Sequence, residues 1–435
     1  MFVYLICYVI SFFLARQHIY VLSGLVLIGA GIWLYLKDYR KNRMLIHLRG
    51  LFCLSFAGGQ GISAFKLSRL QTDWAVETWA CLAVAVVVFW AVFEILTRKF
   101  DGWTAADMQS VYRYFSSADS PLQAKRILIA MSVITGASAL TFCFEAWKLG
   151  FIPMFSYGVP HAYSYFHVTG FHYITVSCVL VPSLFVIYAK MISRRGHGLT
   201  RDKGFWLAAA LAVVAAAIPL LCVSRFQLIL ALGMAAFTLL SMSDDVNLLY
   251  IAGLVLFLVP AYLVLTVLRS HSVDYLNGIF EMKNSRMPIW ITQPYIYIAN
   301  NYDNFNCLVT QLARHAWGIK GLFPVWTLTG LKFMFPSLVS FPVFFTKEEL
   351  TTLTLFYDAY YDFGIMGMAL FGGLLGAGCY LVCRFRRKAA CPVVHMFYGQ
   401  IAMYMMLAFF TTWFSNPTTW FYMIVTGAVY LYVRS

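Results

Sequence analysis

The sequence predicts an all-α protein that crosses a membrane many times, and three observations lead to that fold class. Hydrophobic residues make up 61% of the 435 residues, whereas charged residues make up only 11%. The mean hydropathy of +0.74 is too high for a soluble chain of this length. Apolar stretches of about 15 to 22 residues, each long enough to cross a bilayer as a helix, recur along the whole chain.

These stretches predict about 12 transmembrane helices. The expected spans are residues 1–15, 19–36, 46–65, 76–97, 127–147, 172–190, 205–223, 226–241, 248–268, 356–383, 395–414 and 417–433. The first span begins at Met1 without a basic leader or a small-residue cleavage site, so we interpret it as a retained helix. Three regions follow from the pattern: nine helices in residues 1–268, one large loop in 269–355 and three helices in 356–435.

The net charge of +14 is distributed by loop, which indicates a membrane topology rather than a nucleic-acid partner. Basic residues gather after alternate spans, in "KDYRKNR" after the second, "RRGHGLTRDK" after the sixth and "RFRRK" after the tenth. The positive-inside rule assigns these loops to the cytoplasm. Both termini are then expected to be cytoplasmic, and residues 269–355 to be external.

The loop of residues 269–355, between the ninth and tenth spans, is the largest segment expected outside the membrane. Loops this long are uncommon unless they have a function. Its apolar stretch 321–345 contains three prolines and Lys332. We expect this stretch to lie in the outer interface, or to re-enter the membrane without crossing, because another crossing would place "RFRRK" outside.

Polar residues on the expected external side form the candidate site. They are the histidines His161, His167 and His315, the arginines Arg225, Arg269, Arg286 and Arg314, and the carboxylates Asp358 and Asp362 with the neighbouring Tyr361. On a helix, Asp358 and Asp362 lie four residues apart and share one face. A carboxylate without a partner at the mouth of an apolar helix is energetically costly, so we expect external arginines to hold them.

Four short stretches resemble a known family. They are "GFIPMFS" at 150–156, "SRFQLIL" at 224–230, "NNYDNFN" at 300–306 and "TTLTLFYDAYYDFGIMG" at 351–367. Their order and spacing, between about residue 140 and residue 376, are similar to those of bacterial oligosaccharide repeat unit polymerases, also called O-antigen or Wzy-type polymerases. By residue type alone, "NNYDNFN" is typical of a turn and loop scaffold.

The resemblance implies a glycosyltransferase of the GT-C kind in the bacterial cytoplasmic membrane, with its active site facing the periplasm or exterior. Such an enzyme transfers a glycan from one undecaprenyl pyrophosphate carrier to the repeat unit on another, and so builds O-antigen, capsule or exopolysaccharide. Its expected partners are these lipid-linked glycans, membrane lipid and a chain-length regulator. The external segments contain no DxD-like pair. We therefore expect neither a metal nor another cofactor.

The chemistry of that reaction assigns roles to the candidate residues. Arginines bind a departing pyrophosphate through two parallel hydrogen bonds, which suits Arg225, Arg269, Arg286 and Arg314. The acceptor hydroxyl needs a general base or a hydrogen-bonding partner, for which Asp358, Asp362, His315, His161, His167 and His172 all remain candidates. Aromatic rings such as Tyr361 stack on sugar faces.

Other interpretations of the same residues stay open. Arg225 and Arg269 could interact only with lipid headgroups at helix ends, and Asp358 and Asp362 could hold the loop without touching substrate. A different GT-C transferase, such as an O-antigen ligase, would have similar polar loops. A lipid-oligosaccharide flippase or another transporter should carry charges near the bilayer midplane. Here the charges gather at the outer edge, which favours an enzyme.

Overall fold

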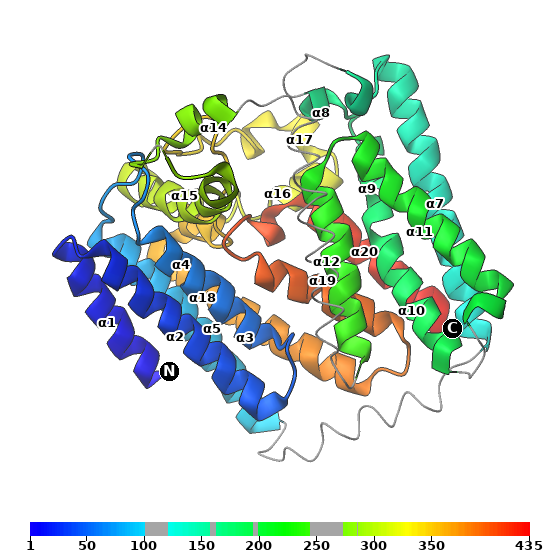
Figure 1. Ribbon diagram of the computed structural model, residues 1–435, viewed down its shortest axis with the longest axis horizontal. Helices are drawn as coiled ribbons and strands as arrows, with labels where there is room; N and C mark the ends of the chain where they lie inside the picture. Colours follow the sequence, from blue (N-terminus) through cyan, green and yellow to red (C-terminus); the bar gives the residue numbers. More distant parts are fainter. Residues whose placement is uncertain (101–120, 157–161, 195–198, 244–272, 285) are drawn as a thin grey trace. The chain divides into compact units, whose positions relative to one another are not determined.

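The structure is a computed structural model, and it describes the chain apart from residues 101–120, 157–161, 195–198, 244–272 and 285 (Figure 1). The described residues form helices without a β-strand, and one isolated β-bridge joins Ser68 to Met282. Among them, 7 helical segments are long and apolar enough to cross a membrane: Tyr20–Asn42, Val76–Phe100, Pro121–Leu149, Phe171–Arg194, Lys203–Leu221, Arg225–Met242 and Tyr357–Lys388. The prediction of an all-α chain with repeated membrane-length helices is confirmed. The expected span 248–268 lies outside the described residues.

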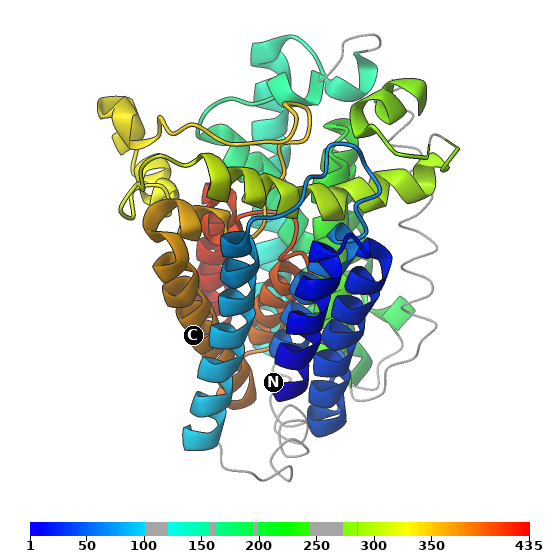
Figure 2. The same ribbon diagram turned by 90° about the vertical axis from the view of Figure 1, so that its left-hand side faces the viewer.

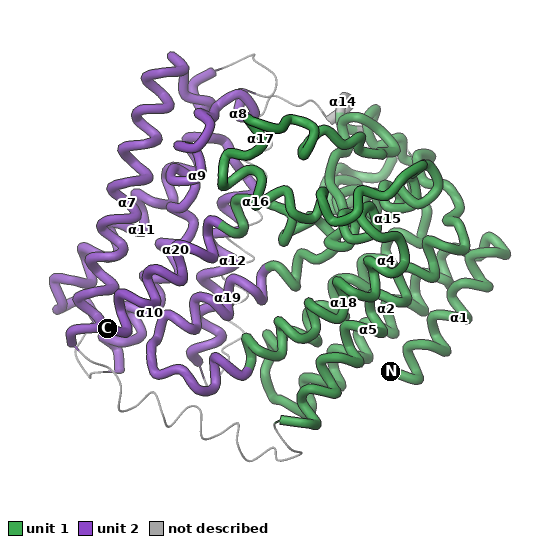
Figure 3. Tube along the Cα trace, turned by 180° about the vertical axis from the view of Figure 1, so that it is seen from behind, with its two compact units in different colours: residues 1–105, 273–383, 404–420 green, residues 106–272, 384–403, 421–435 purple. Residues whose placement is uncertain are grey.

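The chain divides into two compact units, each built from segments that are distant in sequence (Figure 3). Unit 1 contains residues 1–105, 273–383 and 404–420. Unit 2 contains residues 106–272, 384–403 and 421–435. Most of the candidate site residues belong to unit 1.

The upright helices of unit 1 pack closely because small residues face one another. They are α1 (Phe2–Arg16), α2 (Tyr20–Asn42), α3 (Leu48–Phe52), the π-helical turn Cys53–Ala57, α4 (Gly58–Ser63), α5 (Val76–Phe100) and most of α18 (Tyr357–Lys388). Between α1 and α2, the hydroxyls of Ser11 and Ser23 each donate to the other's carbonyl at 2.9 Å. A Cβ on Gly24 would lie 2.5 Å from the carbonyl oxygen of Gly61 in α4. This spacing tolerates only glycine, and it brings the two backbones together.

One long helix lies across the ends of these upright helices (Figure 2). It is α15 (Ile289–Gln311), preceded by α14 (Val273–Phe280). The sequence "NNYDNFN" lies inside α15, so the expectation of a turn and loop there is wrong. Its side chains are buried and bonded: the amide of Asn304 donates to the carbonyls of Leu350 and Thr352 at 2.8 and 2.9 Å. Tertiary hydrogen bonds therefore override the local turn preference of asparagine.

The apolar stretch 321–345 forms only short helical pieces in unit 1. They are α16 (Phe323–Leu328), α17 (Leu331–Met334) and the 3₁₀ turn Pro336–Leu338. Phe333, Met334 and Phe335 are each more than half exposed. Short, broken helices with outward apolar side chains agree with an interfacial location better than with a full crossing.

A buried ionic network occurs among the upright helices of unit 1, away from α15. The guanidinium of Arg49 bonds to the carboxylate of Asp38 in α2, and its Nη1 donates to Oε2 of Glu94 in α5 at 2.5 Å. Arg49 is 3% exposed, and its guanidinium also lies 4.9 Å from the ring centre of Trp90. Both carboxylates are therefore compensated where an isolated charge would be costly.

Unit 2 is a second helical bundle. Its elements are α7 (Pro121–Leu149), the 3₁₀ turn Pro153–Phe155, α8 (Ala162–Tyr165), α9 (Phe171–Val176), the 3₁₀ turn Ser177–Leu180, α10 (Val181–Arg194), the 3₁₀ turn Leu199–Arg201, α11 (Lys203–Leu221), α12 (Arg225–Met242), most of α19 (Val393–Met406) and most of α20 (Pro417–Arg434).

In α7, Glu145 is fully buried. It accepts hydrogen bonds from the backbone N–H of Val168 and the hydroxyl of Thr175, both at 2.8 Å. This carboxylate fixes the segment before α9 onto α7.

Candidate functional site

The candidate site begins at a break in α18. Phe363 (φ −138°, ψ 17°) and Gly364 (φ 59°, ψ −143°) leave the helical conformation, so residues 357–362 form a separate short segment ahead of the long helix. Gly364 has a positive φ that other residues adopt only with strain. Both Asp358 and Asp362 lie on the short segment.

Asp362 organises the loop that follows α15. Its Oδ1 accepts a hydrogen bond from the backbone N–H of Lys320 at 3.1 Å, and its Oδ2 from that of Gly321 at 2.7 Å. The carbonyls of Tyr361 and Asp362 accept from the N–H groups of Ala316 and Trp317, both at 3.1 Å. Residues 316–321 are thus bound to the start of α18 through their own backbone.

Asp358 is buried and its partner is a lysine rather than an arginine. Its Oδ1 lies 3.7 Å from Nζ of Lys320, and the side chains of Thr412 and Ser415 hydrogen bond to the carboxylate. The expectation that arginines hold this pair is not met by the contacts of Asp358 and Asp362 within the described residues. Lys320 was not among the residues predicted from the sequence, although it is the only lysine or arginine between Arg314 and Lys332.

Tyr361 is also part of this platform. Its side chain is only 3% exposed, with Nζ of Lys320 4.7 Å from the ring centre and Phe341 packed edge-on at 5.8 Å. A covered ring cannot stack on a sugar. The nearby exposed ring is Trp317, which is 75% exposed.

His315 lies on the exposed side of the same platform. Its Nδ1 is 3.3 Å from the carbonyl oxygen of Tyr361. Since a carbonyl can only accept, we assign the proton of the neutral ring to Nδ1, which leaves Nε2 as a base. The rings of Tyr360 and Trp317 pack against the imidazole at 6.0 and 6.4 Å. A Cβ on Gly364 would lie 3.2 Å from Nε2, so the glycine also makes room for the ring.

Two further side chains complete the surroundings of His315. Arg314 precedes it in the chain and is exposed. Glu77, in the first turn of α5, accepts a hydrogen bond from the hydroxyl of Tyr360 at 2.8 Å. Glu77 was not among the predicted site residues, because more than 200 residues separate it from the others and no motif includes it. Glu77 is exposed, and it contacts the tyrosine whose ring packs against the imidazole of His315.

Asp303 anchors the helix that leads into this loop. Its Oδ1 accepts from Nζ of Lys66 at 2.7 Å and from Nε1 of Trp74 at 2.8 Å, and its Oδ2 accepts from Nε2 of Gln71 at 2.7 Å. Asp303 is 1% exposed. Burial lowers the pKa of the Lys66 ammonium group, and the ion pair with Asp303 opposes that shift. Because α15 ends at Gln311, this anchor helps to set the position of His315 four residues later.

Of the remaining predicted residues, one lies elsewhere in unit 1, two lie in unit 2 together with His172, and two lie outside the described residues. Arg286 is exposed in the turn before α15, where its N–H donates to Oδ1 of Asn284 at 3.0 Å. Arg225 is buried at the first turn of α12, and His167 is exposed with its Nδ1 3.1 Å from the carbonyl of Ser164; both belong to unit 2. His161 and Arg269 lie outside the described residues.

Within the part of the chain that the structure describes, no group of three or more His, Cys, Asp or Glu side chains could hold a metal ion. The candidate site consists of a buried platform, formed by Asp358, Asp362, Lys320 and Tyr361, and an exposed group formed by Arg314, His315 and Trp317.

Comparisons with family models, with curated proteins and with solved structures find no match to this chain.

Proposed function

We propose that the protein is a metal-independent glycosyltransferase that joins undecaprenyl-pyrophosphate-linked oligosaccharide repeat units into a surface polysaccharide. In this proposal the chain is a GT-C-like protein of the bacterial cytoplasmic membrane with about 12 crossings. Residues 269–355 form its outer loop, both termini are cytoplasmic and the reaction occurs at the outer face. Support comes from the resemblance of the four sequence patches and from the chemistry of the group around His315.

The single observation that carries the proposal is the exposed trio Arg314, His315 and Trp317, in which His315 and Trp317 contact the backbone carbonyls of Tyr361 and Asp362. A base, a guanidinium and an aromatic ring are the three functions that glycosyl transfer from a lipid pyrophosphate requires. The platform holds residues 315–317 by hydrogen bonds to its backbone carbonyls, which limits the loss of conformational freedom when substrate binds. Arg314 is exposed and is free to reorient toward a ligand.

In the proposed reaction, Nε2 of His315 accepts the proton of the acceptor hydroxyl as its oxygen attacks the anomeric carbon of the donor glycan. The bond from that carbon to the pyrophosphate oxygen breaks, and the lipid pyrophosphate leaves with the electron pair. Arg314 stabilises the charge on this leaving group, and Trp317 stacks on a sugar ring. Asp358 and Asp362 position the loop instead of accepting the proton. Arg225, Arg269 and Arg286, with His161 and His167, are further candidates for glycan or pyrophosphate contacts.

Elongation of purified lipid-linked repeat units by the full chain in liposomes tests the proposal. We expect a ladder of longer lipid-linked glycans, formed equally well with a chelator present. His315→Ala should slow elongation by roughly 100-fold or more, as expected for a lost general base. Arg314→Ala, Arg225→Ala and Arg269→Ala should each slow it by about 10- to 100-fold, the rate equivalent of one charge-assisted hydrogen bond. Lysine at these positions should restore only part of the rate.

Arg69→Ala is the matched control, because Arg69 is an exposed arginine of unit 1 outside the site, and it should elongate normally. Undiminished elongation in both His315→Ala and Arg314→Ala would contradict the assigned roles. Product formed only when a non-carrier acceptor lipid is added would identify a ligase instead. Movement of intact lipid-linked glycan across the liposome membrane without elongation would identify a transporter.

A further inference from the structure

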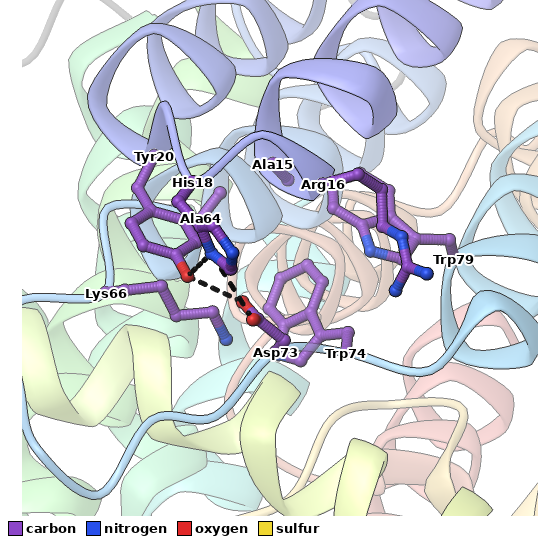
Figure 4. A pocket seen from close by; sticks show the side chains of 9 residues that line it. All are labelled: Ala15, Arg16, His18, Tyr20, Ala64, Lys66, Asp73, Trp74 and Trp79. Carbon is purple, nitrogen blue, oxygen red and sulfur yellow. Dashed lines mark hydrogen bonds and ion pairs between the residues drawn. The ribbon is translucent and has the colours of Figure 1, made fainter.

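The helical hairpin of α1 and α2 in unit 1 has a hollow at each end. At the turn between the two helices, a cavity of about 270 Å³ contains His18, Tyr20 and Asp73 (Figure 4). The hydroxyl of Tyr20 donates to Oδ1 of Asp73 at 2.8 Å, and Nδ1 of His18 lies 3.5 Å from Oδ2 of the same carboxylate. These three side chains satisfy one another, so they do not specify a ligand.

The hollow at the opposite end of the hairpin is a cleft of about 540 Å³, lined by the start of α1 and the last turns of α2. Its side chains are of two kinds. The apolar ones include Phe2 and Val3 of α1 with Trp33 and Leu36 of α2, and the basic ones are Lys37, Arg40 and Lys41 of α2. No Asp or Glu is among the described residues that line the cleft. The proposed function assigns no role to this end of the hairpin.

The apolar and basic side chains of the cleft are arranged in order along α2. Trp33, Lys37 and Lys41 lie four residues apart, so they follow one another on one face of the helix. Leu36 and Arg40 form a neighbouring row with the same spacing. In both rows the apolar residue comes first and the cation lies nearer to the helix end. The cleft therefore changes from an apolar surface to a basic one along a single direction.

The positive charge of the cleft is not neutralised by the carboxylates of the neighbouring helices. Asp38 and Glu94 both bind Arg49 in the buried ionic network. The side chain of Arg40 is exposed and forms no hydrogen bond or ion pair within the described residues. Lys37 is also exposed, and it forms no ion pair with the residues that the structure describes. Their charges are available to an anionic ligand.

The apolar side chains of the cleft are accessible to a ligand. Phe2 is 76% exposed and Trp33 is 46% exposed. The apolar surface continues from the cleft along α1, where Ile6 and Val9 are exposed as well. A hydrocarbon chain that starts in the cleft can therefore follow α1 away from the cations.

Two general rules explain why basic residues occur at this end of α2. Lysine and arginine mark the cytoplasmic ends of membrane helices, and they also interact favourably with the negative end of the helix dipole. Neither rule requires an accessible apolar wall beside the cations, or a cleft as large as a ligand pocket. Apolar surface that leads into a basic pocket between membrane helices is instead typical of a site for an anionic lipid.

We infer that this cleft binds one anionic glycerophospholipid of the surrounding membrane. The phosphate of the lipid pairs with Arg40 and Lys37, and an acyl chain lies against Trp33 and Phe2. The inference does not depend on the proposed polymerase activity, because a ligase or a transporter could carry the same site. Its test measures lipid binding, so its failure leaves the elongation experiment unaffected.

Native mass spectrometry of the full chain in detergent tests the inference by counting bound lipids during a titration. The probes are phosphatidylglycerol, phosphatidylcholine with the same acyl chains, and inorganic phosphate. We expect one phosphatidylglycerol to bind at least about 10-fold more tightly than phosphatidylcholine, because only phosphatidylglycerol carries a net negative charge. Inorganic phosphate should bind weakly, because it cannot use the apolar wall.

Replacing the cations should weaken the binding of phosphatidylglycerol alone. Each cation contributes a factor of about 5, so Arg40→Gln should weaken it by about 5-fold and Arg40→Gln with Lys37→Gln by about 25-fold. Binding of phosphatidylcholine should not change in either variant. Arg43→Gln is the matched control, because Arg43 is exposed, follows Arg40 by three residues and does not line the cleft. It removes the same charge and should bind phosphatidylglycerol as the unaltered protein does.

Thermal unfolding without added lipid should be the same in all three variants and in the unaltered protein, which separates a binding defect from misfolding. Equal weakening in Arg43→Gln and Arg40→Gln would overturn the inference, because the lipid would then respond only to the overall surface charge. Equal affinity for the two lipids would also overturn it. Tighter binding of inorganic phosphate than of phosphatidylglycerol would do the same and would identify a simple anion site.

Discussion

Asp303 and Asp362 are two buried carboxylates of unit 1 that are satisfied in different ways. Asp303 is enclosed by the side chains of Lys66, Gln71 and Trp74, which come from the segment between α4 and α5. Asp362 accepts from backbone N–H groups of a single loop. The difference shows that a buried carboxylate can serve either of two purposes in an apolar chain. Asp303 joins helices, whereas Asp362 shapes a loop whose neighbouring side chains remain exposed.

The largest effect is expected at Asp303. Asp303→Asn keeps the shape of the side chain but leaves the buried ammonium group of Lys66 without its anionic partner. The free energy of unfolding should fall by about 3 to 5 kcal/mol, as for other broken buried ion pairs. Thermal unfolding in detergent measures this loss. Glu348→Gln, at an exposed carboxylate of the same unit, should change stability by less than about 0.5 kcal/mol. Equal stability of the two variants would mean that Asp303 does not fix α15.

A smaller and more local effect is expected at Asp362. Asp362→Asn removes the charge and one of the two acceptor oxygens, so the N–H of Lys320 or Gly321 loses a charge-assisted bond worth about 1.5 to 3 kcal/mol. Hydrogen exchange should become faster in residues 316–322, whereas the thermal transition should shift less than in Asp303→Asn. Unchanged exchange in that segment would remove the loop-shaping role. A shift as large as that of Asp303→Asn would abolish the distinction between the two carboxylates.

The smallest effect is expected at the hydrogen bonds that fasten the loop before α18 onto α15. The hydroxyl of Thr352 donates to Oδ1 of Asn301 at 2.5 Å. Thr352→Val keeps the volume and removes this donor, which should lower the free energy of unfolding by about 1 kcal/mol. Thr329→Val is its control, because Thr329 caps the end of α16 and its exposed hydroxyl bonds only to the carbonyl of Val325 in that helix. Chemical denaturation of both variants would show whether the bond to α15 contributes more.

The helices were predictable from the sequence, because apolar stretches of membrane length leave few alternatives to a helix. All but the first residue of the expected span 19–36, for example, lie within α2. For residues 300–306, inside α15, the prediction of a turn was wrong, because Asn301, Asp303 and Asn304 form hydrogen bonds with residues far away in sequence. Local composition gives no sign of those partners, and it favoured a turn.

The candidate site was predictable only in part. The proximity of Asp358, Asp362 and Tyr361 follows from their spacing, and His315 was grouped with them because it lies in the loop expected to be external. Lys320 and Glu77 could not be found in this way. Their contacts with Asp358 and Tyr360 depend on how the loop of residues 316–321 and α5 pack against α18, and no local sequence pattern predicts this packing.

The break at Phe363 and Gly364 also determines which changes the protein can tolerate. The uninterrupted helix from residue 365 to residue 388 is about 36 Å long at 1.5 Å per residue, enough to cross a hydrocarbon layer of about 30 Å without the preceding segment. Residues 357–362 therefore need not enter the lipid at all. Substitutions among them can alter the chemistry of the loop while insertion of the helix into the membrane continues unchanged, so this short segment can diversify independently of the span that it precedes.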